Sequence, residues 1–223
     1  MNIDFHAHIL PAADHGSDGL DTSLRQLTLA REAGIDLIAA TPHFYPRKES
    51  PEQFFRRRAE TAAELQQALE GAPCPEVRIG SETNLCRGLH HMEQVEELCL
   101  QGTKVLLLEL PGDFSIRGYE DTLESLLYDR KLTVVLAHID RYPTNTVEAL
   151  MEMGCLAQLN AESFCHWRTR RRSLDWAKDE RIVALGSDIH GVHTGYGDFE
   201  RMRRRLGTVY DAVMERTEAL LGR

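Results

Sequence analysis

The sequence predicts one α/β domain in which parallel strands form a closed or nearly closed barrel. Seven short runs rich in Leu or β-branched residues alternate with seven longer, charged stretches of helical period. Such alternation is typical of parallel strands joined by right-handed helical crossovers. No glycine-rich nucleotide turn follows the first run, which favours a barrel over a doubly wound sheet. No linker or low-complexity tract divides residues 1–223, so we expect a single domain.

The expected elements follow in chain order. Strands are predicted at residues 2–6, 36–41, 76–81, 104–110, 132–138, 156–160 and 182–187. Helices are predicted near residues 20–33, 51–70, 91–100, 119–129, 145–153, 168–179 and 197–221. Gly34 and Gly154 directly follow two of these helices. Glycine is a frequent helix stop because it adopts the left-handed conformation easily.

Composition and charge exclude several classes of protein. The chain has 223 residues and a formal net charge of −9, whereas nucleic-acid backbones select a basic surface. No apolar run is long enough to span a bilayer, and the first residues enter a strand pattern without a signal-like region. Five cysteines, an odd number without a Cys-x-x-Cys pair, indicate reduced thiols in a cytoplasmic protein. We therefore expect neither nucleic-acid binding nor membrane insertion.

The most informative motif is Asp-Phe-His-Ala-His at residues 4–8. His6 and His8 lie two residues apart, so in a β-strand they point to the same face. Two imidazoles that converge at a strand end can begin a metal site if further ligands arrive from elsewhere in the chain. On its own the motif more often marks two ordinary strand histidines.

Further ligand-type side chains stand where later predicted strands end. These residues are His43 after the second strand, Glu82 after the third, His138 after the fifth, and Asp188 and His190 after the seventh. In a β/α barrel all strand carboxyl ends open onto one face, where active sites are built. A single histidine at a strand end is more often structural, but a set drawn from five strands predicts a multinuclear metal centre.

The ligand types favour hydrolysis. Imidazoles mixed with carboxylates suit Zn, Mn or Fe, and the thiolates typical of structural zinc are missing. Glu82 can bridge two ions through its two oxygens, and a bridging hydroxide would then serve as the nucleophile at neutral pH. Arg141, three residues after His138, can clamp phosphate oxygens, although it could also form a surface ion pair with Asp140.

Five motifs in this order resemble the polymerase-and-histidinol-phosphatase (PHP) superfamily. They are the His-x-His start, Thr-Pro-His, Gly-Ser-Glu, Ala-His-Ile-Asp-Arg-Tyr and Ser-Asp-Ile-His. The sequence is most similar to the bacterial capsular-polysaccharide tyrosine phosphatase branch, whose His-Ile-Leu-Pro pattern matches residues 8–11. The resemblance extends from residue 2 to about residue 200.

This resemblance implies a distorted barrel of seven β/α units with three metal ions, most often manganese. It also implies hydrolysis of phosphotyrosine on a tyrosine kinase of exopolysaccharide or capsule biosynthesis. By position, His6, His8, Glu82 and Asp188 would hold one ion, and Glu82, His43 and His138 a second. Asp14 or its neighbour His15, together with His190, would hold the third. Arg141 would bind phosphate, and Arg141 and Asp14 are the expected catalytic residues.

The chain departs from the branch at a few positions. The usual acidic pair before Gly16 is Asp14-His15, and the usual Ala before Ser187 is Gly186. An arginine and two prolines often follow the last histidine, but here residues 191–197 read Gly-Val-His-Thr-Gly-Tyr-Gly. His193 in this segment, and Tyr45 near the second strand, are candidate substrate contacts.

Three alternatives stay open. A small phosphomonoester such as histidinol phosphate or a nucleotide would use the same chemistry, because substrate contacts come from variable loops. A barrel that binds metal only for structure is disfavoured by the complete ligand set. Cys165 and Arg171 fit the Cys-x5-Arg loop of thiol phosphatases, but the loop has no glycine to let backbone amides surround a phosphate.

Overall fold

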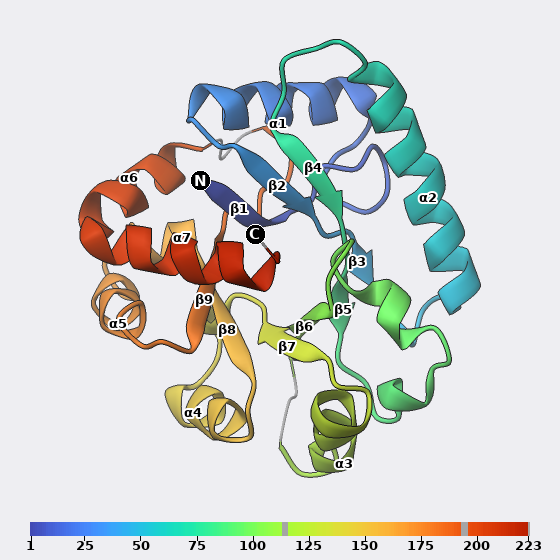
Figure 1. The fold of residues 1–223 in the computed structure, drawn as a ribbon, viewed down its shortest axis with the longest axis vertical. Helices are drawn as coiled ribbons and strands as arrows, with labels where there is room; N and C mark the ends of the chain where they lie inside the picture. The colour runs from blue at the N-terminus through green and yellow to red at the C-terminus, as the bar shows by residue number, and fades with distance from the viewer. Residues whose placement is uncertain (113–115, 193–195, 223) are drawn as a thin grey trace.

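Parallel strands surrounded by helices make up the computed structural model, which describes residues 1–112, 116–192 and 196–222 (Figure 1). All seven predicted strands are present, and two short ones are added. The strands are β1 (Ile3–Ala7), β2 (Leu37–Ala40), β3 (His43–Phe44), β4 (Glu76–Ile79), β5 (Glu82–Asn84), β6 (Val105–Glu109), β7 (Thr133–Leu136), β8 (Leu156–Asn160) and β9 (Ile182–Gly186).

The strands form a ring with seven positions. One sheet has the order β1-β2-β4 and the other β3-β5-β6-β7-β8-β9, and every pair is parallel. β3 and β5 begin three residues after β2 and β4 end, so each continues the same position in the ring. The two sheets meet where Asp188 N donates to His6 O at 2.8 Å and His8 N donates to Ile189 O at 3.3 Å. The predicted α/β barrel is therefore confirmed.

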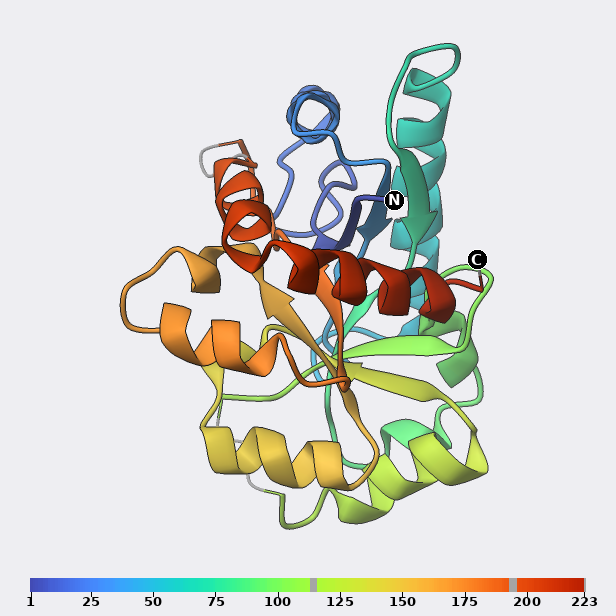
Figure 2. The ribbon, with the colours of Figure 1, turned by 60° about the vertical axis from the view of Figure 1, so that its left-hand side comes forward.

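Most of the helices surround the ring of strands, whereas α7 passes in front of the strands in both views (Figures 1 and 2). Their bounds are α1 (Leu20–Glu32), α2 (Pro51–Ala68), α3 (Glu120–Glu124), α4 (Thr144–Glu152), α5 (Arg170–Trp176), α6 (Gly197–Leu206) and α7 (Thr208–Leu220). The predicted stop at Gly34 has φ 75°, and the one at Gly154 has φ 107°, as a glycine helix end requires. Among the described helices, none is long and apolar enough to cross a membrane.

Two helix predictions are wrong in detail. Residues 91–100 do not form one helix, because this region contains only two short 3₁₀ turns, η1 (Leu89–His91) and η2 (Val95–Leu98). In η2 the buried residues Val95 and Leu98 are three apart, which is the repeat of a 3₁₀ helix. The predicted helix 197–221 is interrupted by Gly207, whose φ of 54° no right-handed helix accommodates. The helix predicted at 119–129 is present, but its second half, Ser125–Asp129, is a π-helical turn.

The barrel strands are buried on both faces, which explains their continuous apolar runs. Leu106, Leu108, Val134, Leu136 and Leu185 are all inaccessible to solvent. The polar residues come at or just beyond the strand ends, where parallel strands leave side chains on one common edge. The fold thus separates an apolar barrel interior from a polar face at the carboxyl ends of the strands.

Candidate metal centre

A cluster of histidines and carboxylates lies at the carboxyl ends of the strands. His6 is on β1, His43 begins β3, and Glu82 begins β5. His138 and Asp188 each stand two residues beyond the end of a strand, β7 and β9 respectively. These side chains are almost entirely inaccessible to solvent. Burial of this many titratable groups is costly unless they bind one another or a metal ion. The sequence prediction that these strand ends converge is confirmed by their contacts.

Glu82 is at the centre of the cluster. Its Oε2 lies 3.3 Å from His6 Nε2, 3.2 Å from His8 Nε2 and 2.9 Å from His43 Nδ1. Its Oε1 lies 2.7 Å from His138 Nε2. Burial alone would raise the pKa of this carboxyl. His6 and the hydrogen bond from His138 lower the pKa by more than burial raises it, so it lies well below the usual value. Glu82 is therefore a carboxylate shared among four imidazoles.

Asp188 contacts the same two histidines from the opposite strand. Its Oδ1 lies 3.5 Å from His6 Nε2 and 3.3 Å from His8 Nε2. Its Oδ2 accepts hydrogen bonds from Arg141 and, at 3.0 Å, from Asn160 Nδ2. Burial raises the pKa of Asp188, but His6, His8 and Arg141 lower it below its ordinary value. Asp188 also has a φ of 51°, a left-handed conformation that is uncommon outside glycine and often found at functional sites.

Asp14 orients His8 in the structure. Its Oδ2 lies 2.7 Å from His8 Nδ1 and accepts a hydrogen bond from His43 N at 2.8 Å. Its Oδ1 accepts from Gly16 N at 2.8 Å. Burial alone would raise the pKa of Asp14. The contacts with His8 lower this pKa by more than burial raises it, so the group is a carboxylate. A carboxylate on Nδ1 favours the proton there, so Nε2 of His8 would be the atom that binds a metal ion.

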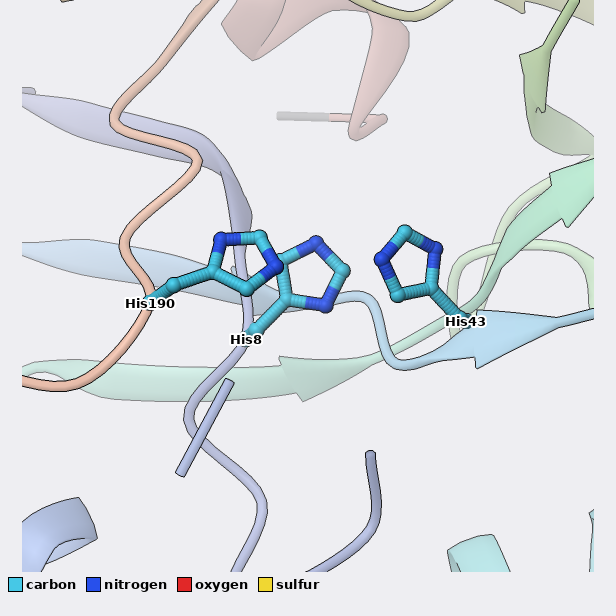
Figure 3. A group of neighbouring side chains, drawn as sticks. All are labelled: His8, His43 and His190. Atoms are coloured by element: carbon cyan, nitrogen blue, oxygen red, sulfur yellow. The ribbon is translucent and has the colours of Figure 1, made fainter. Parts of the chain in front are cut away.

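His190 and His15 form the outer layer of the cluster. The rings of His190, His8 and His43 lie side by side, with His8 between the other two and its ring centroid 4.2 Å from His190 and 4.4 Å from His43 (Figure 3). His190 Nδ1 lies 2.9 Å from the carbonyl oxygen of Asp188, which can only accept. Burial and the neighbouring charge on His8 lower the pKa of His190 to about 4, so its ring is neutral. His15 is exposed, and its ring stacks on His43 at 4.8 Å.

The donor set fits divalent metal ions. Three groups have ligand atoms within 4.8 Å of one another, namely His6, His8 and Asp188; His8, His43 and His190; and His43, Glu82 and Glu109. Within this cluster, three buried polar atoms form no hydrogen bond of acceptable geometry in the described part of the chain, namely His43 Nδ1, Glu82 Oε2 and His190 Nε2. The first two of these lie 2.9 Å apart without the geometry of a hydrogen bond. Buried orphan atoms of this kind are rare unless an ion completes them. Neutral imidazoles mixed with carboxylates suit manganese, iron or zinc.

Glu109 is a candidate ligand that the sequence reasoning missed. It ends β6, next to the Glu82 strand, and groups with His43 and Glu82. Its Oε2 accepts a hydrogen bond from Asn84 Nδ2 at 3.1 Å. The signal was present, because Glu109 is an acid at the end of a run of leucines in the predicted strand 104–110. Glu109 stands at the end of β6, the strand between those of Glu82 and His138, for which the sequence named no ligand.

The predicted substrate residues lie at the rim of the cluster. The Arg141 side chain is 50% exposed and forms an ion pair with Asp188. Tyr45 stacks on the ring of His43, with the ring centroids 5.0 Å apart. Burial and the nearby Glu109 raise the pKa of the Tyr45 phenol, which is therefore protonated. His193, the third predicted substrate contact, lies outside the described residues.

Sequence comparison identifies the family. Residues 2–215 match the family described as capsular polysaccharide synthesis, CpsB/CapC. This chain belongs to that family. It is 29% identical over 210 residues to the tyrosine-protein phosphatase YwqE of Bacillus subtilis (strain 168), a match that covers 86% of this chain and 78% of the relative.

Structural comparison agrees. The structure matches a chain from the crystal structures of YwqE from Bacillus subtilis and CpsB from Streptococcus pneumoniae, described as unique metal-dependent tyrosine phosphatases. The TM-score is 0.84 at 25% identity, over 99% of this chain and 94% of the other. Histidinol phosphate phosphatase from Lactococcus lactis, with zinc, L-histidinol and phosphate, matches at a TM-score of 0.59 and 12% identity, over 95% and 93% of the two chains. That second likeness shows a shared fold alone.

These comparisons confirm the PHP branch that the motifs predicted, and the chain is a homologue of a metal-dependent tyrosine phosphatase. The individual ligand assignments stay predictions, including the choice between Asp14 and His15. The comparisons also leave the number and identity of the ions as expectations.

Proposed function

We propose that residues 1–223 form one catalytic domain that hydrolyses phosphotyrosine on a protein, most plainly a tyrosine kinase of exopolysaccharide or capsule synthesis. The observation that carries this proposal is Glu82, a buried carboxylate shared by four imidazoles that come from the ends of three strands. A purely structural site has no need for two further acids and an exposed arginine beside it. The similarity to YwqE supports phosphotyrosine as the substrate group.

The ligands divide into three sets. His6, His8, Glu82 and Asp188 would hold one ion, and Glu82, His43 and His138, with Glu109, a second. His190 would hold a third together with Asp14 or His15. Divalent ions bound here, with manganese the first expectation, would activate water and neutralise charge on the phosphoryl group. Asp14 holds the proton of His8 on Nδ1, which keeps Nε2 available as a ligand.

Arg141 would bind the phosphoryl oxygens. Its guanidinium reaches Asp188 while half of the side chain stays in solvent, so it can exchange that carboxylate for a phosphate without unfolding any element. Asp188 and Asp140 raise the pKa of Arg141 against the effect of burial, so the side chain stays charged. The Tyr45 ring, stacked on His43, offers an apolar surface for the aromatic ring of the substrate.

A thiol mechanism does not fit the structure. Burial, together with the hydrogen bond from Cys165 Sγ to the carbonyl oxygen of Asp198, raises the pKa of the thiol. A nucleophilic cysteine needs the opposite shift, because the thiolate is the reactive form. Cys165 is also followed by a short, tryptophan-containing loop and not by a glycine-rich phosphate cradle.

Turnover on matched substrates tests the proposal. We expect the manganese-loaded protein to hydrolyse p-nitrophenyl phosphate and a phosphotyrosine peptide, with kcat/KM on the peptide at least about tenfold above that on histidinol phosphate. Chelation should abolish both activities, and manganese should restore them, while Cys165→Ser leaves the rates unchanged. Metal per chain is measured on the same samples.

Two results would contradict this assignment. Activity that survives complete removal of metal would overturn the metal-dependent mechanism. A preference for histidinol phosphate over the peptide would keep the chemistry but replace the protein substrate with a small phosphomonoester.

A further inference from the structure

Two buried amides on β8 lie behind the metal centre and have no role in the mechanism so far. Gln158 and Asn160 are two residues apart on the same strand, so their side chains point to the same face. Gln158 is inaccessible to solvent and Asn160 is 2% exposed. Burying two amides among charged groups is expensive unless each polar atom has a defined partner.

A backbone hydrogen bond fixes how both amides are oriented. His138 N donates to Gln158 Oε1 at 2.7 Å, and a backbone N–H can only donate. The other atom of the amide, Nε2, must then be the donor to Asn160 Oδ1, at 2.9 Å. Asn160 is thereby also oriented, so its Nδ2 donates to Asp188 Oδ2 at 3.0 Å. One peptide N–H thus sets the direction of a chain of three hydrogen bonds that ends on Asp188.

The same oxygen determines which nitrogen of His6 is free. His6 Nδ1 lies 3.2 Å from Gln158 Oε1, which can only accept, so the contact is a hydrogen bond when Nδ1 carries the proton. His6 Nε2, on the other side of the ring, approaches Glu82 and Asp188. With the proton held on Nδ1, Nε2 would be available to bind a metal ion together with these two carboxylates.

We propose that Gln158 and Asn160 are positioning residues that act as one relay. Gln158 holds His6 in the tautomer that can bind metal and holds the backbone of His138, and Asn160 aims Asp188. The relay would thus align three metal-binding residues that come from three different strands. Outer partners of this kind orient metal ligands and raise their affinity.

Gly186 leaves the space that the relay occupies. It pairs in register with Asn160 on the neighbouring strand. A Cβ at position 186 would lie 2.6 Å from His6 Cβ and 2.8 Å from Gln158 Nε2, closer than real Cβ contacts permit. These close approaches explain physically why position 186 is glycine.

Zinc binding and ¹⁵N NMR of the zinc-loaded protein test the relay. We expect Gln158→Leu and Asn160→Ala to weaken zinc affinity by about 10- to 100-fold, measured by competition with a chromophoric chelator. In the wild type the His6 proton should be on Nδ1. Gln158→Glu keeps the accepting oxygen, so it should keep that proton on Nδ1.

Thr217→Val is the matched control, because Thr217 is an equally buried polar residue whose hydroxyl donates to Val183 O, away from the metal centre. It should leave zinc affinity within about twofold of the wild type. The relay is wrong if the wild-type proton is on Nε2 of His6. It is equally wrong if folded Gln158→Leu and Asn160→Ala proteins bind zinc as tightly as the Thr217→Val control.

A second, independent feature is an exposed basic surface formed by the residues that lead into α5 and by the first residues of that helix. We call Trp167, Arg168, Arg170 and Arg171 the arginine–tryptophan surface. Trp167 is 72% exposed, and Arg168 lies over its ring with the guanidinium carbon 4.8 Å from the centroid. Among the described residues, only Met1, Tyr128 and Trp167 are large exposed hydrophobic side chains. An exposed tryptophan beside arginines is the composition of binding surfaces more than of ordinary solvent-exposed faces.

The chain on both sides of this surface reaches the rim of the metal centre. The segment that carries it begins at Glu162, which lines a cavity of about 50 Å³ together with Arg141 and Asp188. The carbonyl oxygen of Glu162 accepts hydrogen bonds from Cys165 N and His166 N, which fixes the start of the segment. At its other end, Arg172 donates to the carbonyl oxygen of Asp140, the neighbour of Arg141.

Charge complementarity points to an acidic occupant. Within the described part of the chain, Arg168, Arg170 and Arg171 form no ion pair, although the whole chain has a net charge of −9. We infer that the arginine–tryptophan surface binds an acidic stretch of the protein substrate next to its phosphotyrosine. This inference rests on the proposed function, because it assumes a protein substrate.

Peptides that differ only in their flanking residues test the surface. For Arg168→Gln/Arg171→Gln we expect KM for an acid-flanked phosphotyrosine peptide to rise about fivefold. KM for a neutral-flanked peptide, kcat, and turnover of p-nitrophenyl phosphate should stay within about twofold of the wild type. The charge-matched control is Arg203→Gln/Arg204→Gln. These two arginines lie away from the arginine–tryptophan surface, because they line a different cavity together with Asn2 and Ile35, just before β1 and β2.

Equal KM changes for the acid-flanked and the neutral-flanked peptide, or equal changes in the two double variants, would overturn this inference. If the wild type hydrolyses no phosphotyrosine peptide, the proposed function fails separately. Fluorescence polarisation of a labelled, unphosphorylated acidic peptide then decides the surface alone. The inference is supported if the wild type binds the peptide and the Arg168→Gln/Arg171→Gln variant does not. It is overturned if the variant binds as well as the wild type, or if the wild type does not bind the peptide.

Discussion

Glu82→Gln is expected to lower kcat/KM for p-nitrophenyl phosphate by about a thousandfold or more and to reduce the bound metal per chain. Glu82 contacts four histidines through its two oxygens. An amide keeps the size of the side chain but removes its charge, and its nitrogen cannot act as a ligand. The several kcal/mol of transition-state stabilisation that the ions supply would be lost with them.

The measurement pairs steady-state rates with elemental analysis of metal, after equilibration with the same manganese concentration. Glu97→Gln is the matched control, because Glu97 is exposed. This substitution removes the same charge at a position away from the metal centre. Thermal unfolding of each metal-free protein checks that the variant folds. A Glu82→Gln protein with full metal content and at least a tenth of the wild-type rate would show that Glu82 does not connect the ions.

The sequence was sufficient for the features of this centre that depend on chain periodicity. Buried strands produce apolar runs, and a polar residue that ends such a run must lie at the edge of the sheet, so His43, Glu82 and Asp188 could be found without coordinates. Glu109 followed the same rule, but one acid after several leucines resembles an ordinary strand end. The group formed with His43 and Glu82 is what distinguishes it.

Other features depend on contacts between segments that are distant in sequence. Asp14 and His15 are neighbours with similar prospects as ligands, and only the fold places Asp14 against His8 and against the backbone of His43. Gln158 carries no signal in the sequence, because its role depends on residues 20 and 152 positions away. The helix break at Gly207 was missed because a glycine inside an amphipathic pattern is often tolerated.

Gly16→Ala is expected to destabilise the protein by about 3 kcal/mol, because the added methyl group has no space. A Cβ at Gly16 would lie 2.1 Å from His8 Cβ and 2.7 Å from the His8 carbonyl oxygen. Both atoms belong to the rigid end of the first strand, so no flexible side chain can move aside. The same loop holds Asp14, whose Oδ1 accepts from Gly16 N, and Gly16 O accepts from Gly191 N in the segment after His190.

Relief of this clash must therefore displace either His8 or the loop that orients it, so Gly16→Ala should weaken metal binding as well as stability. Denaturant unfolding of the metal-free protein measures the first effect, and chelator competition measures the second. Gly19→Ala is the control three residues away, where a Cβ meets no atom within 4 Å and the φ of 166° is extended backbone open to any residue. That variant should stay within about 0.5 kcal/mol of the wild type. If the two alanine variants unfold at the same denaturant concentration, the close packing of the loop against His8 is not what holds the ligand in place.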